Sequence, residues 1–394
     1  DLIHEVFCEV HIILNLIRCA LKMNDQQFDL CFISFSELST DGRSLNFINT
    51  FKTIGLSICT ISIIYGNQYQ STKDNLLINL QQNHRLLYNW QKFIRKIKKN
   101  SNLIKSKIYF ATDLYSLAAA ISIADSTSKI IYDSREIFSA LGTLQKSSFK
   151  QFALSQLELY FSSKVDKFVV TGELDAEYLS SHFKTNKPFF IVKNYPRKRQ
   201  NYPSSNYLRS YFNIPETKKI CLYQGVLLEG RGIIPMLKVM KLLENYVFCI
   251  VGDGKSKEKF ENIAKDMNVK DKVFFHKSVP YENLFEITSS ADIGIAIIEP
   301  VTFSYELALP NKLFEYFQAG LPVLVSDLPA MKKEVEKYKV GEIVPSSLTP
   351  TEIYSAVKNL EQNYQIYKRN VLKIQNTINF ESQLEIIKQI VMFN

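Results

Sequence analysis

The strongest constraint on the fold is the alternation of short apolar runs with helical patterns. From Asp29 onward, strand-like runs are separated by segments of helical periodicity, such as the helix expected over Arg43–Ile54. The strand-like runs of the first half are Leu30–Ile33, Leu56–Ile64, Ile108–Phe110, Ile130–Tyr132, Phe168–Val170 and Phe189–Val192. Because strands that alternate with helices form parallel sheets covered on both faces, this half predicts a doubly wound α/β domain.

A polar linker bounded by Pro196 and Pro203 interrupts the alternation, which then restarts. The strand-like runs of the second half are Ile220–Tyr223, Tyr246–Val251, Val273–Phe275, Ile293–Ile298 and Pro322–Val325. A chain of 394 residues is also too long for one hydrophobic core, since single cores stop growing near about 250–300 residues. We therefore predict two doubly wound domains, residues 1–195 and 196–375. Ligands of such sheets bind at the carboxyl ends of the strands, so a central cleft that both domains face is the expected site.

The chain is basic, with a formal net charge of +9. A positive charge favours phosphorylated ligands, nucleic acid or an anionic membrane as partners. We do not expect nucleic acid, because no known binding module appears. One basic and aromatic run, residues 84–107, contains no acidic residue. It suits either an anionic membrane surface or a solvated helix that packs its apolar side on the core, and the sequence leaves both open.

No membrane-spanning segment or clean secretory signal is visible in the sequence. An amphipathic helix is expected near the start, where Val6, Val10, Ile13, Ile17 and Leu21 recur at helical spacing, and it either packs on the core or rests on a membrane. None of the six cysteines forms a C-x-x-C pair, which suits a reducing compartment. We expect a cytoplasmic protein, with peripheral binding to the inner face of the plasma membrane as an open option.

The most informative segment runs from Leu309 to Asp327. Pro310 suits the first turn of a helix, because its missing N–H costs nothing there. Gly320 ends this helix and Pro322 prevents its continuation into the strand that follows. Leu313, Phe314 and Phe317 are expected to form its buried stripe.

The chemistry of this helix suits a diphosphate. A helix N-terminus carries free N–H groups and a partial positive charge, and Lys312 adds a full charge in the first turn. Glu315, three residues on, could accept hydrogen bonds from ribose hydroxyls. On the residues alone, an ordinary surface helix with a Lys–Glu pair is an equally good interpretation.

This segment resembles the family-four glycosyltransferases of the bacterial surface-polysaccharide type, whose signature is P-N-K-x-x-E-Y-x-x-x-G-x-P-V. The resemblance covers about residues 29–394 and is strongest from Leu222 to Ile343. It implies the GT-B fold, with two Rossmann-like domains and a last helix in residues 376–394 that crosses back to the N-terminal domain. It also implies that Glu315 holds the donor ribose and that the helix start at Asn311, Lys312 and Leu313 faces the diphosphate. Many members carry a second glutamate where this chain has Leu307, with Glu306 one position away.

Other segments of the second half add to the implied donor site. Gly225 permits close backbone approach after a strand, and Arg231 can contact phosphate oxygens with its guanidinium. Val226 stands where the family has a further basic residue. The resemblance places Gly252 beside the donor and assigns reading of the base to the backbone of Lys277, Ser278 and Val279.

The resemblance implies retaining transfer, in which the departing phosphate takes the acceptor proton. Arg231 and Lys312 are then the expected catalytic residues, since they would stabilise charge on the leaving diphosphate. No Asp-x-Asp motif lies at a strand end. We therefore expect no metal and no cofactor other than the nucleotide sugar, which is a co-substrate.

The acceptor side is expected in the N-terminal half. The resemblance assigns to it Asp41, Arg43, Asp113, Arg135 and Glu136. Thr112 and Arg135 stand where related sequences have histidines, so no histidine-based role is predicted.

Together these features predict an enzyme that moves a hexose-type sugar from a nucleotide-sugar donor to a glycan or lipid-linked acceptor in cell-surface polysaccharide biosynthesis. A nucleotide-sugar 2-epimerase on the same fold and a non-catalytic nucleotide-sugar-binding subunit are the alternatives. A dinucleotide dehydrogenase is disfavoured, because no G-x-G-x-x-G follows the first strand.

Overall fold

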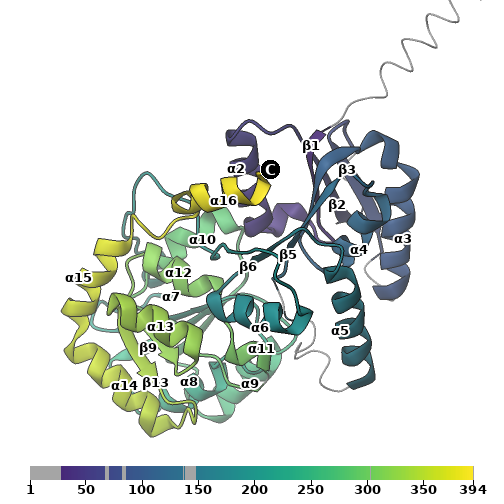
Figure 1. The fold of residues 1–394 in the computed structure, drawn as a ribbon. Helices are drawn as coiled ribbons and strands as arrows, with labels where there is room; N and C mark the ends of the chain where they lie inside the picture. The colour runs from purple at the N-terminus through teal and green to yellow at the C-terminus, as the bar shows by residue number, and fades with distance from the viewer. Residues whose placement is uncertain are drawn as a thin grey trace, which may run out of the picture. The chain divides into compact units, whose positions relative to one another are not determined.

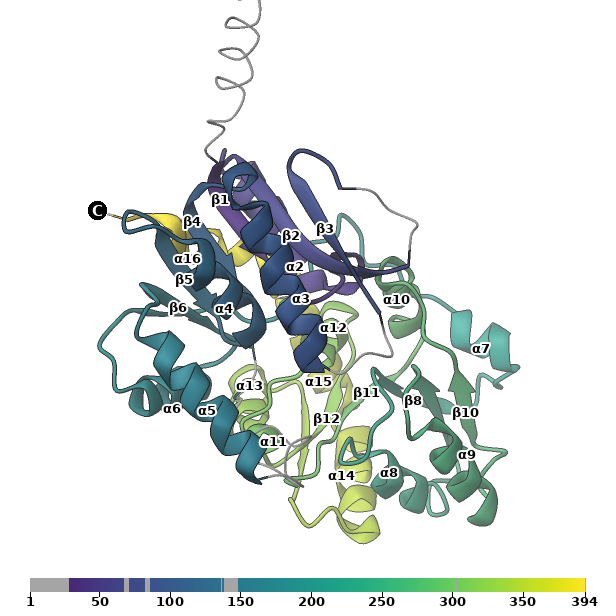
Figure 2. The same ribbon diagram turned by 90° about the vertical axis from the view of Figure 1, so that its right-hand side faces the viewer.

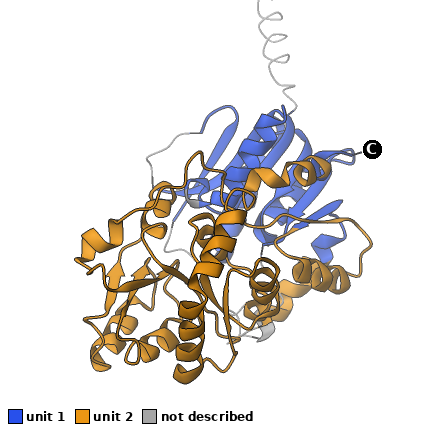
Figure 3. Cartoon of the chain, turned by 90° about the vertical axis from the view of Figure 1, so that its left-hand side faces the viewer, with its two compact units in different colours: residues 1–135, 160–169, 390–394 blue, residues 136–159, 170–389 orange. Residues whose placement is uncertain are grey.

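The computed structural model describes residues 28–66, 71–81, 86–135, 137, 148–301 and 303–393. Its contacts divide the chain into two compact units (Figure 3). The first comprises residues 1–135, 160–169 and 390–394, and the second comprises residues 136–159 and 170–389. These are groupings by contact, so the predicted domain boundaries at 195 and 375 remain predictions. The amphipathic helix predicted over Val6–Leu21 lies outside the described residues.

The first sheet has the strand order β3-β2-β1-β4-β5-β6-β7 (Figures 1 and 2). Its pairings from β3 to β6 are parallel. The strands are β1 (Phe28–Ile33), β2 (Ile58–Tyr65), β3 (Asn75–Leu80), β4 (Ser106–Ala111), β5 (Lys129–Asp133), β6 (Lys167–Val170) and β7 (Phe189–Ile191). The helices between them are α2 (Gly42–Thr53), α3 (Leu86–Lys99), α4 (Leu114–Ile123), α5 (Ser148–Ser162) and α6 (Glu173–Phe183).

The second sheet is also parallel, with the order β10-β9-β8-β11-β12-β13. Its strands are β8 (Lys219–Gln224), β9 (Tyr246–Val251), β10 (Val273–His276), β11 (Ile293–Ala296), β12 (Val323–Ser326) and β13 (Gly341–Val344). The helices that follow β7 in the chain are α7 (Tyr207–Phe212), α8 (Ile233–Val239), α9 (Lys257–Asp266), α10 (Tyr281–Thr288), α11 (Phe303–Glu306), α12 (Asn311–Gln318), α13 (Pro329–Tyr338), α14 (Pro350–Gln362), α15 (Tyr364–Ile374) and α16 (Leu384–Val391). The strand order reverses between β8 and β11, and such a switch point is where doubly wound sheets bind ligands.

The second sheet is buried on both faces. Successive residues of β8 alternate between two apolar clusters: Ile220 and Leu222 belong to one, and Cys221 and Tyr223 to the other. Leu313, Phe314 and Phe317 of α12 are fully buried in the first cluster, which confirms the predicted stripe. A sheet covered by helices on both sides is the doubly wound architecture that the alternation predicts.

The end of the chain packs on the first sheet within its own unit. The backbone carbonyl of Met392, just after α16, accepts a hydrogen bond from Lys167 Nζ of β6. The same ammonium lies 4.1 Å from the ring centroid of Phe393. Across the described ranges, no helix combines the length and apolar character that crossing a bilayer requires.

Candidate functional site

The first part of the candidate site is a pair of glycine turns at the carboxyl ends of β8 and β9. Gly225 follows β8 and has a φ of +130°, and Gly252 follows β9 and has a φ of +148°. A Cβ on Gly252 would lie 2.0 Å from the carbonyl oxygen of Gly225. Only glycine tolerates this φ and this approach at position 252, so the two turns are packed backbone against backbone.

The signature helix α12 begins at Asn311, one residue later than predicted. Pro310 is its N-cap in an extended conformation, and its carbonyl accepts the N–H of Leu313 at 3.1 Å. No side chain caps this helix start. The side chain of Leu313 is fully buried, so only its backbone faces the helix start, whereas Asn311 is exposed. The arrangement leaves the positive end of the helix uncovered by side-chain oxygen.

Lys312 is the most unusual charge in the second unit. Only 9% of the residue is exposed, and among the described residues it makes no ion pair within 4.0 Å. Its Nζ lies 3.5 Å from the ring centroid of Tyr223. Burial lowers the pKa of Lys312 well below its ordinary value, Arg231 lowers it further, and Glu315 acts in the opposite direction. A buried ammonium without a counter-ion is suited to receive an anion.

Glu315 is held by a hydrogen-bonded chain. Gln224 Nε2 donates to Glu315 Oε2 at 2.5 Å, and Thr288 Oγ1 donates to Gln224 Oε1 at 2.8 Å. Burial raises the pKa of Glu315, while the hydrogen bond from Gln224 and the charge of Lys312 lower it. Glu315 and Thr288 line one pocket together with Arg199 and Tyr281.

Arg231 lies close to this group. Its guanidinium carbon is 4.5 Å from the ring centroid of Tyr305, and its charge is one of the causes that lower the pKa of Lys312. The structure therefore brings together the two cations that the sequence predicts for the diphosphate, and it adds Tyr305 as the support of one of them.

The loop after β10 is fixed by its neighbours. The N–H and the hydroxyl of Ser278 both donate to Asp253 Oδ2, at 2.8 and 2.7 Å. His276 Nδ1 lies 2.7 Å from the carbonyl oxygen of Lys277, and His276 Nε2 lies 3.1 Å from the hydroxyl of Tyr207. The side chains of Lys277 and Ser278 are exposed and Val279 is half-buried. The amide of Ser278 is thus bound within the protein, and the hydrogen bonds from Ser278 lower the pKa of Asp253.

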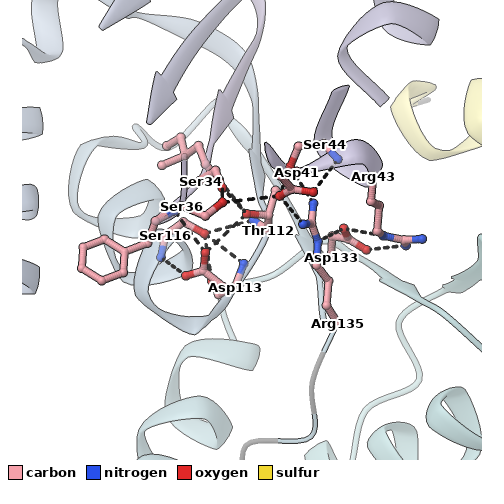
Figure 4. Close-up of polar contacts among 12 residues, drawn as sticks. Ser34, Ser36, Asp41, Arg43, Ser44, Thr112, Asp113, Ser116, Asp133 and Arg135 are labelled. Carbon is pink, nitrogen blue, oxygen red and sulfur yellow. Dashed lines mark hydrogen bonds and ion pairs between the residues drawn. The ribbon is translucent and has the colours of Figure 1, made fainter. Parts of the chain in front are cut away.

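The first unit contains a separate network of arginines and aspartates at the ends of its strands (Figure 4). Arg43 donates two hydrogen bonds to Asp133, Nε to Oδ2 at 3.0 Å and Nη2 to Oδ1 at 2.7 Å. Arg135 Nε donates to Asp133 Oδ2 at 2.8 Å, and Arg135 Nη1 donates to Asp41 Oδ2 at 2.6 Å. Arg43 and Asp133 are almost wholly buried, so each charge depends on its partner.

Asp41 and Asp113 also begin helices. Asp41 caps α2 by accepting the N–H of Ser44 at 3.0 Å, and Asp113 caps α4 by accepting that of Ser116 at 2.7 Å. Burial acts to raise the pKa of Asp41, but Arg135 and Ser44 together bring it below its ordinary value. Burial raises the pKa of Asp113.

The structure thus joins three predicted acceptor-side residues, Asp41, Arg43 and Arg135, into one network. Asp113 lies close to it (Figure 4), and Glu136 is outside the described residues. Asp133, which holds both arginines, is missing from the sequence prediction. In the described part of the chain no group of three or more His, Cys, Asp or Glu side chains is arranged to hold a metal ion.

The two parallel α/β sheets have the GT-B fold. Residues 206–376 match the family model of the glycosyl transferases group 1. Solved structures with the same fold include the sucrose-phosphate synthase of Thermosynechococcus elongatus, with a TM-score of 0.76, 15% identity and coverage of 92% of this chain and 98% of that one. WaaG, a glycosyltransferase involved in lipopolysaccharide biosynthesis, gives a TM-score of 0.65 and 16% identity over 93% and 100% of the two chains. HepE of Anabaena, whose structure was determined in complex with UDP, gives a TM-score of 0.68. It is 11% identical, and the match covers 92% of this chain and 98% of that one.

Two curated relatives are similar over shorter segments. The lipopolysaccharide core biosynthesis glycosyltransferase LpsD of Rhizobium meliloti is 24% identical over 34% of this chain and 36% of its own length. The putative colanic acid biosynthesis glycosyl transferase WcaI of Escherichia coli is 27% identical over 29% of this chain and 28% of its own length. The chain therefore matches about a third of the length of these relatives.

Proposed function

We propose that this chain is a glycosyltransferase that moves a sugar from a nucleotide-sugar donor to a glycan or lipid-linked acceptor. The observation that carries the proposal is the buried ammonium of Lys312, which has no ion-pair partner among the described residues, at the uncapped start of α12 and one helical turn from Glu315. LpsD and WcaI, whose names refer to lipopolysaccharide core and colanic acid biosynthesis, support a place in cell-surface polysaccharide biosynthesis.

The proposed donor site follows from the charges of the second unit. A diphosphate at the start of α12 would meet backbone N–H groups, the ammonium of Lys312 and the guanidinium of Arg231. Glu315 would accept hydrogen bonds from the ribose, and the turns at Gly225 and Gly252 would let the backbone approach the donor. The loop 277–279 would contact the base. HepE, whose structure contains UDP, supports a nucleoside diphosphate as the ligand.

The proposed reaction is hexosyl transfer with retention. The bond between the anomeric carbon and the donor phosphate oxygen breaks, and a bond to the acceptor hydroxyl oxygen forms on the same face of the sugar. The acceptor proton passes to the leaving phosphate, and Lys312 and Arg231 stabilise the charge that develops there. No step in this scheme requires a metal or a cofactor.

We also propose that the acceptor is bound in the first unit, near the network of Asp41, Arg43, Asp113, Asp133 and Arg135. Asp41, Arg43, Asp133 and Arg135 are paired with one another, so their role would be to hold the strand ends in shape. The hydroxyls and carboxylates that line it would then be presented to sugar hydroxyls.

Helix α3 is the proposed contact with an anionic membrane at the inner face of the plasma membrane. Phe93 and Ile97 are buried, whereas Leu86, Leu87 and Tyr88 are 51%, 64% and 51% exposed. Lys92, Arg95, Lys96, Lys98 and Lys99 belong to the same helix. Co-sedimentation with phosphatidylglycerol vesicles should fall when Arg95, Lys96, Lys98 and Lys99 are replaced by glutamine. Equal binding to neutral phosphatidylcholine vesicles would contradict this contact.

The donor assignment is tested by saturation-transfer NMR of the protein with UDP-, GDP- and ADP-sugars. We expect one base to bind selectively and Glu315→Ala to abolish the binding, with slow hydrolysis of that donor by the native protein. A folded protein that binds none of these donors would contradict the proposal, and binding without hydrolysis or transfer would indicate a non-catalytic subunit.

A further inference from the structure

Gln224 lies between two helices at the candidate donor site. It is the last residue of β8 and is 2% exposed. Its side-chain amide contacts Thr288 of α10 on one side, at 2.8 Å, and Glu315 of α12 on the other, at 2.5 Å. Its backbone N–H donates to the hydroxyl of Tyr316 at 3.2 Å. The residue is therefore held at both its backbone and its side chain.

When Glu315 is ionised, the amide of Gln224 has one favoured orientation. An ionised carboxylate accepts hydrogen bonds and cannot donate, so the NH₂ group must face Glu315. The amide oxygen then faces Thr288, whose hydroxyl lies 2.8 Å from this oxygen and 2.8 Å from the carbonyl of Leu284. Thr288 is itself 1% exposed, so the chain from Thr288 through Gln224 to Glu315 is fixed by buried groups.

This chain determines how Glu315 faces the pocket that it lines. The amide of Gln224 donates its hydrogen bond to Oε2 of the Glu315 carboxylate. Burial raises the pKa of Glu315, and of the influences that lower it the hydrogen bond from Gln224 is the largest. Gln224 therefore both directs the carboxylate and favours its ionised form, which is the form that accepts hydrogen bonds.

We propose that Gln224 is a positioning residue that acts through Glu315 and sets the preference of the site for ribonucleotides over deoxyribonucleotides. The inference rests on the proposed function, in which Glu315 holds the ribose of the donor. Gln224 does not itself contact the ligand in this scheme. Its effect is expected only where a ribose hydroxyl is present to meet Glu315.

The test compares nucleotides by calorimetry. The tightest ligand among UDP, GDP, ADP and CDP is titrated beside its 2′-deoxy and 3′-deoxy counterparts and inorganic pyrophosphate. For the native protein we expect the ribonucleotide to bind about tenfold more tightly than at least one deoxynucleotide, as for the loss of a hydrogen bond to a charged group. Gln224→Met has nearly the same shape but no amide, and we expect it to reduce this ratio to about twofold or less while pyrophosphate affinity is unchanged.

Gln318→Met is the matched control. Gln318 is a second buried glutamine, but its amide donates to the carbonyl of Arg197 at 2.6 Å and not to Glu315. We expect it to keep the native ratio. Thr288→Val serves as a second variant if Gln224→Met does not fold, and it should lower the ratio in the same direction.

The outcomes separate this inference from the proposed function. If Gln224→Met keeps the native ratio of ribonucleotide to deoxynucleotide affinity, the role of Gln224 is overturned and donor binding is left intact. The same holds if Gln318→Met lowers this ratio as much as Gln224→Met does. A native protein that binds the ribonucleotide and both deoxynucleotides equally would remove the ribose role of Glu315 and the inference with it. A folded native protein that binds no nucleotide would overturn the proposed function as well.

Discussion

At the scale of single residues, Lys312 carries the strongest conflict between stability and function. It is buried without an ion-pair partner among the described residues, so its charge is a cost to the folded state. We expect Lys312→Met to raise the free energy of unfolding by about 1–3 kcal/mol, the usual cost of an uncompensated buried polar group, and to weaken nucleoside diphosphate binding. Urea denaturation and calorimetry measure the two effects. The exposed Lys270→Met should change neither, and a destabilised Lys312→Met would show that the ammonium supports the fold.

The stability that Lys312→Met is expected to gain should depend on pH in a definite direction. The pKa of Lys312 is lower in the folded chain than in the unfolded one, so its cost is complete below the folded value. As pH rises from there towards the ordinary value of 10.5, the unfolded chain holds a proton that the folded chain has released, and the native protein gains stability. The advantage of Lys312→Met should therefore shrink with rising pH in this window. An advantage that is constant with pH would contradict a lowered pKa.

Donor affinity should decline on both sides of neutral pH. Burial raises the pKa of Glu315 above its ordinary value of 4.5, so the carboxylate loses its acceptor form at a higher pH than an exposed glutamate does. On the alkaline side, Lys312 loses its proton, and with it its charge, at a pH below its ordinary pKa of 10.5. Calorimetric titrations of a nucleoside diphosphate across pH would show both limbs. Glu315→Gln should lack the acid limb, and an unchanged acid limb in that variant would assign it to another group.

The sequence predicted the residues of the proposed donor site but not the groups that hold them. Lys312, Glu315 and Arg231 come from a contiguous signature and a glycine turn, and the structure brings them together in one unit. Gln224 reads as an ordinary strand residue, because its partner Glu315 is 91 positions away in the chain. The partners of Asp133 and Asp253 could not be predicted for the same reason, since a carboxylate's partners depend on the tertiary fold.

At the scale of elements, the glycine turns should be the least tolerant positions of the second sheet. A Cβ on Gly252 would lie 2.0 Å from the carbonyl of Gly225, and its φ of +148° disfavours other residues. We expect Gly252→Ala to lower the free energy of unfolding by about 2–4 kcal/mol and to impair donor binding. Gly55→Ala is the control, because its φ is +90° but a Cβ there would have no atom within 4 Å. Equal losses in the two variants would show that backbone conformation alone matters at Gly252.

The predicted strands were confirmed as elements, with shifts of one or two residues at their ends. Two strands of the structure were not predicted, β3 and β13, and both lie at an edge of a sheet. In β3, Asn75 and Asn79 break the apolar run, and β13 has four residues and starts with Gly341. An edge strand needs fewer apolar side chains than a central strand does, so its apolar run is harder to recognise in the sequence.

At the scale of the whole molecule, the second unit contains a buried ion pair between Lys193 and Glu334. Lys193 Nζ lies 2.5 Å from Glu334 Oε1 of α13 and 3.4 Å from Glu173 Oε1 of α6. Glu334 is 1% exposed, so Lys193→Met would leave its charge buried without this partner. We expect a loss of about 3–5 kcal/mol in urea denaturation. The double variant Lys193→Met, Glu334→Leu should recover most of it, and a double variant as unstable as the single one would contradict this cause.

The two doubly wound sheets were predicted from alternation alone, because period and length distinguish strand from helix without knowledge of the partners. The choice between core and membrane for residues 84–107 was beyond the sequence. In the structure, Phe93 and Ile97 of α3 are buried, whereas the apolar residues at its start are exposed. Its contact with a membrane remains a proposal.

The most direct test of the central claim is a crystal structure determined with the nucleoside diphosphate that binds most tightly. We expect the phosphates to lie within hydrogen-bonding distance of the first N–H groups of α12 and of Lys312 Nζ, with a ribose hydroxyl on Glu315. A nucleotide bound elsewhere in the chain, or one at α12 whose ribose does not touch Glu315, would contradict the proposed donor site.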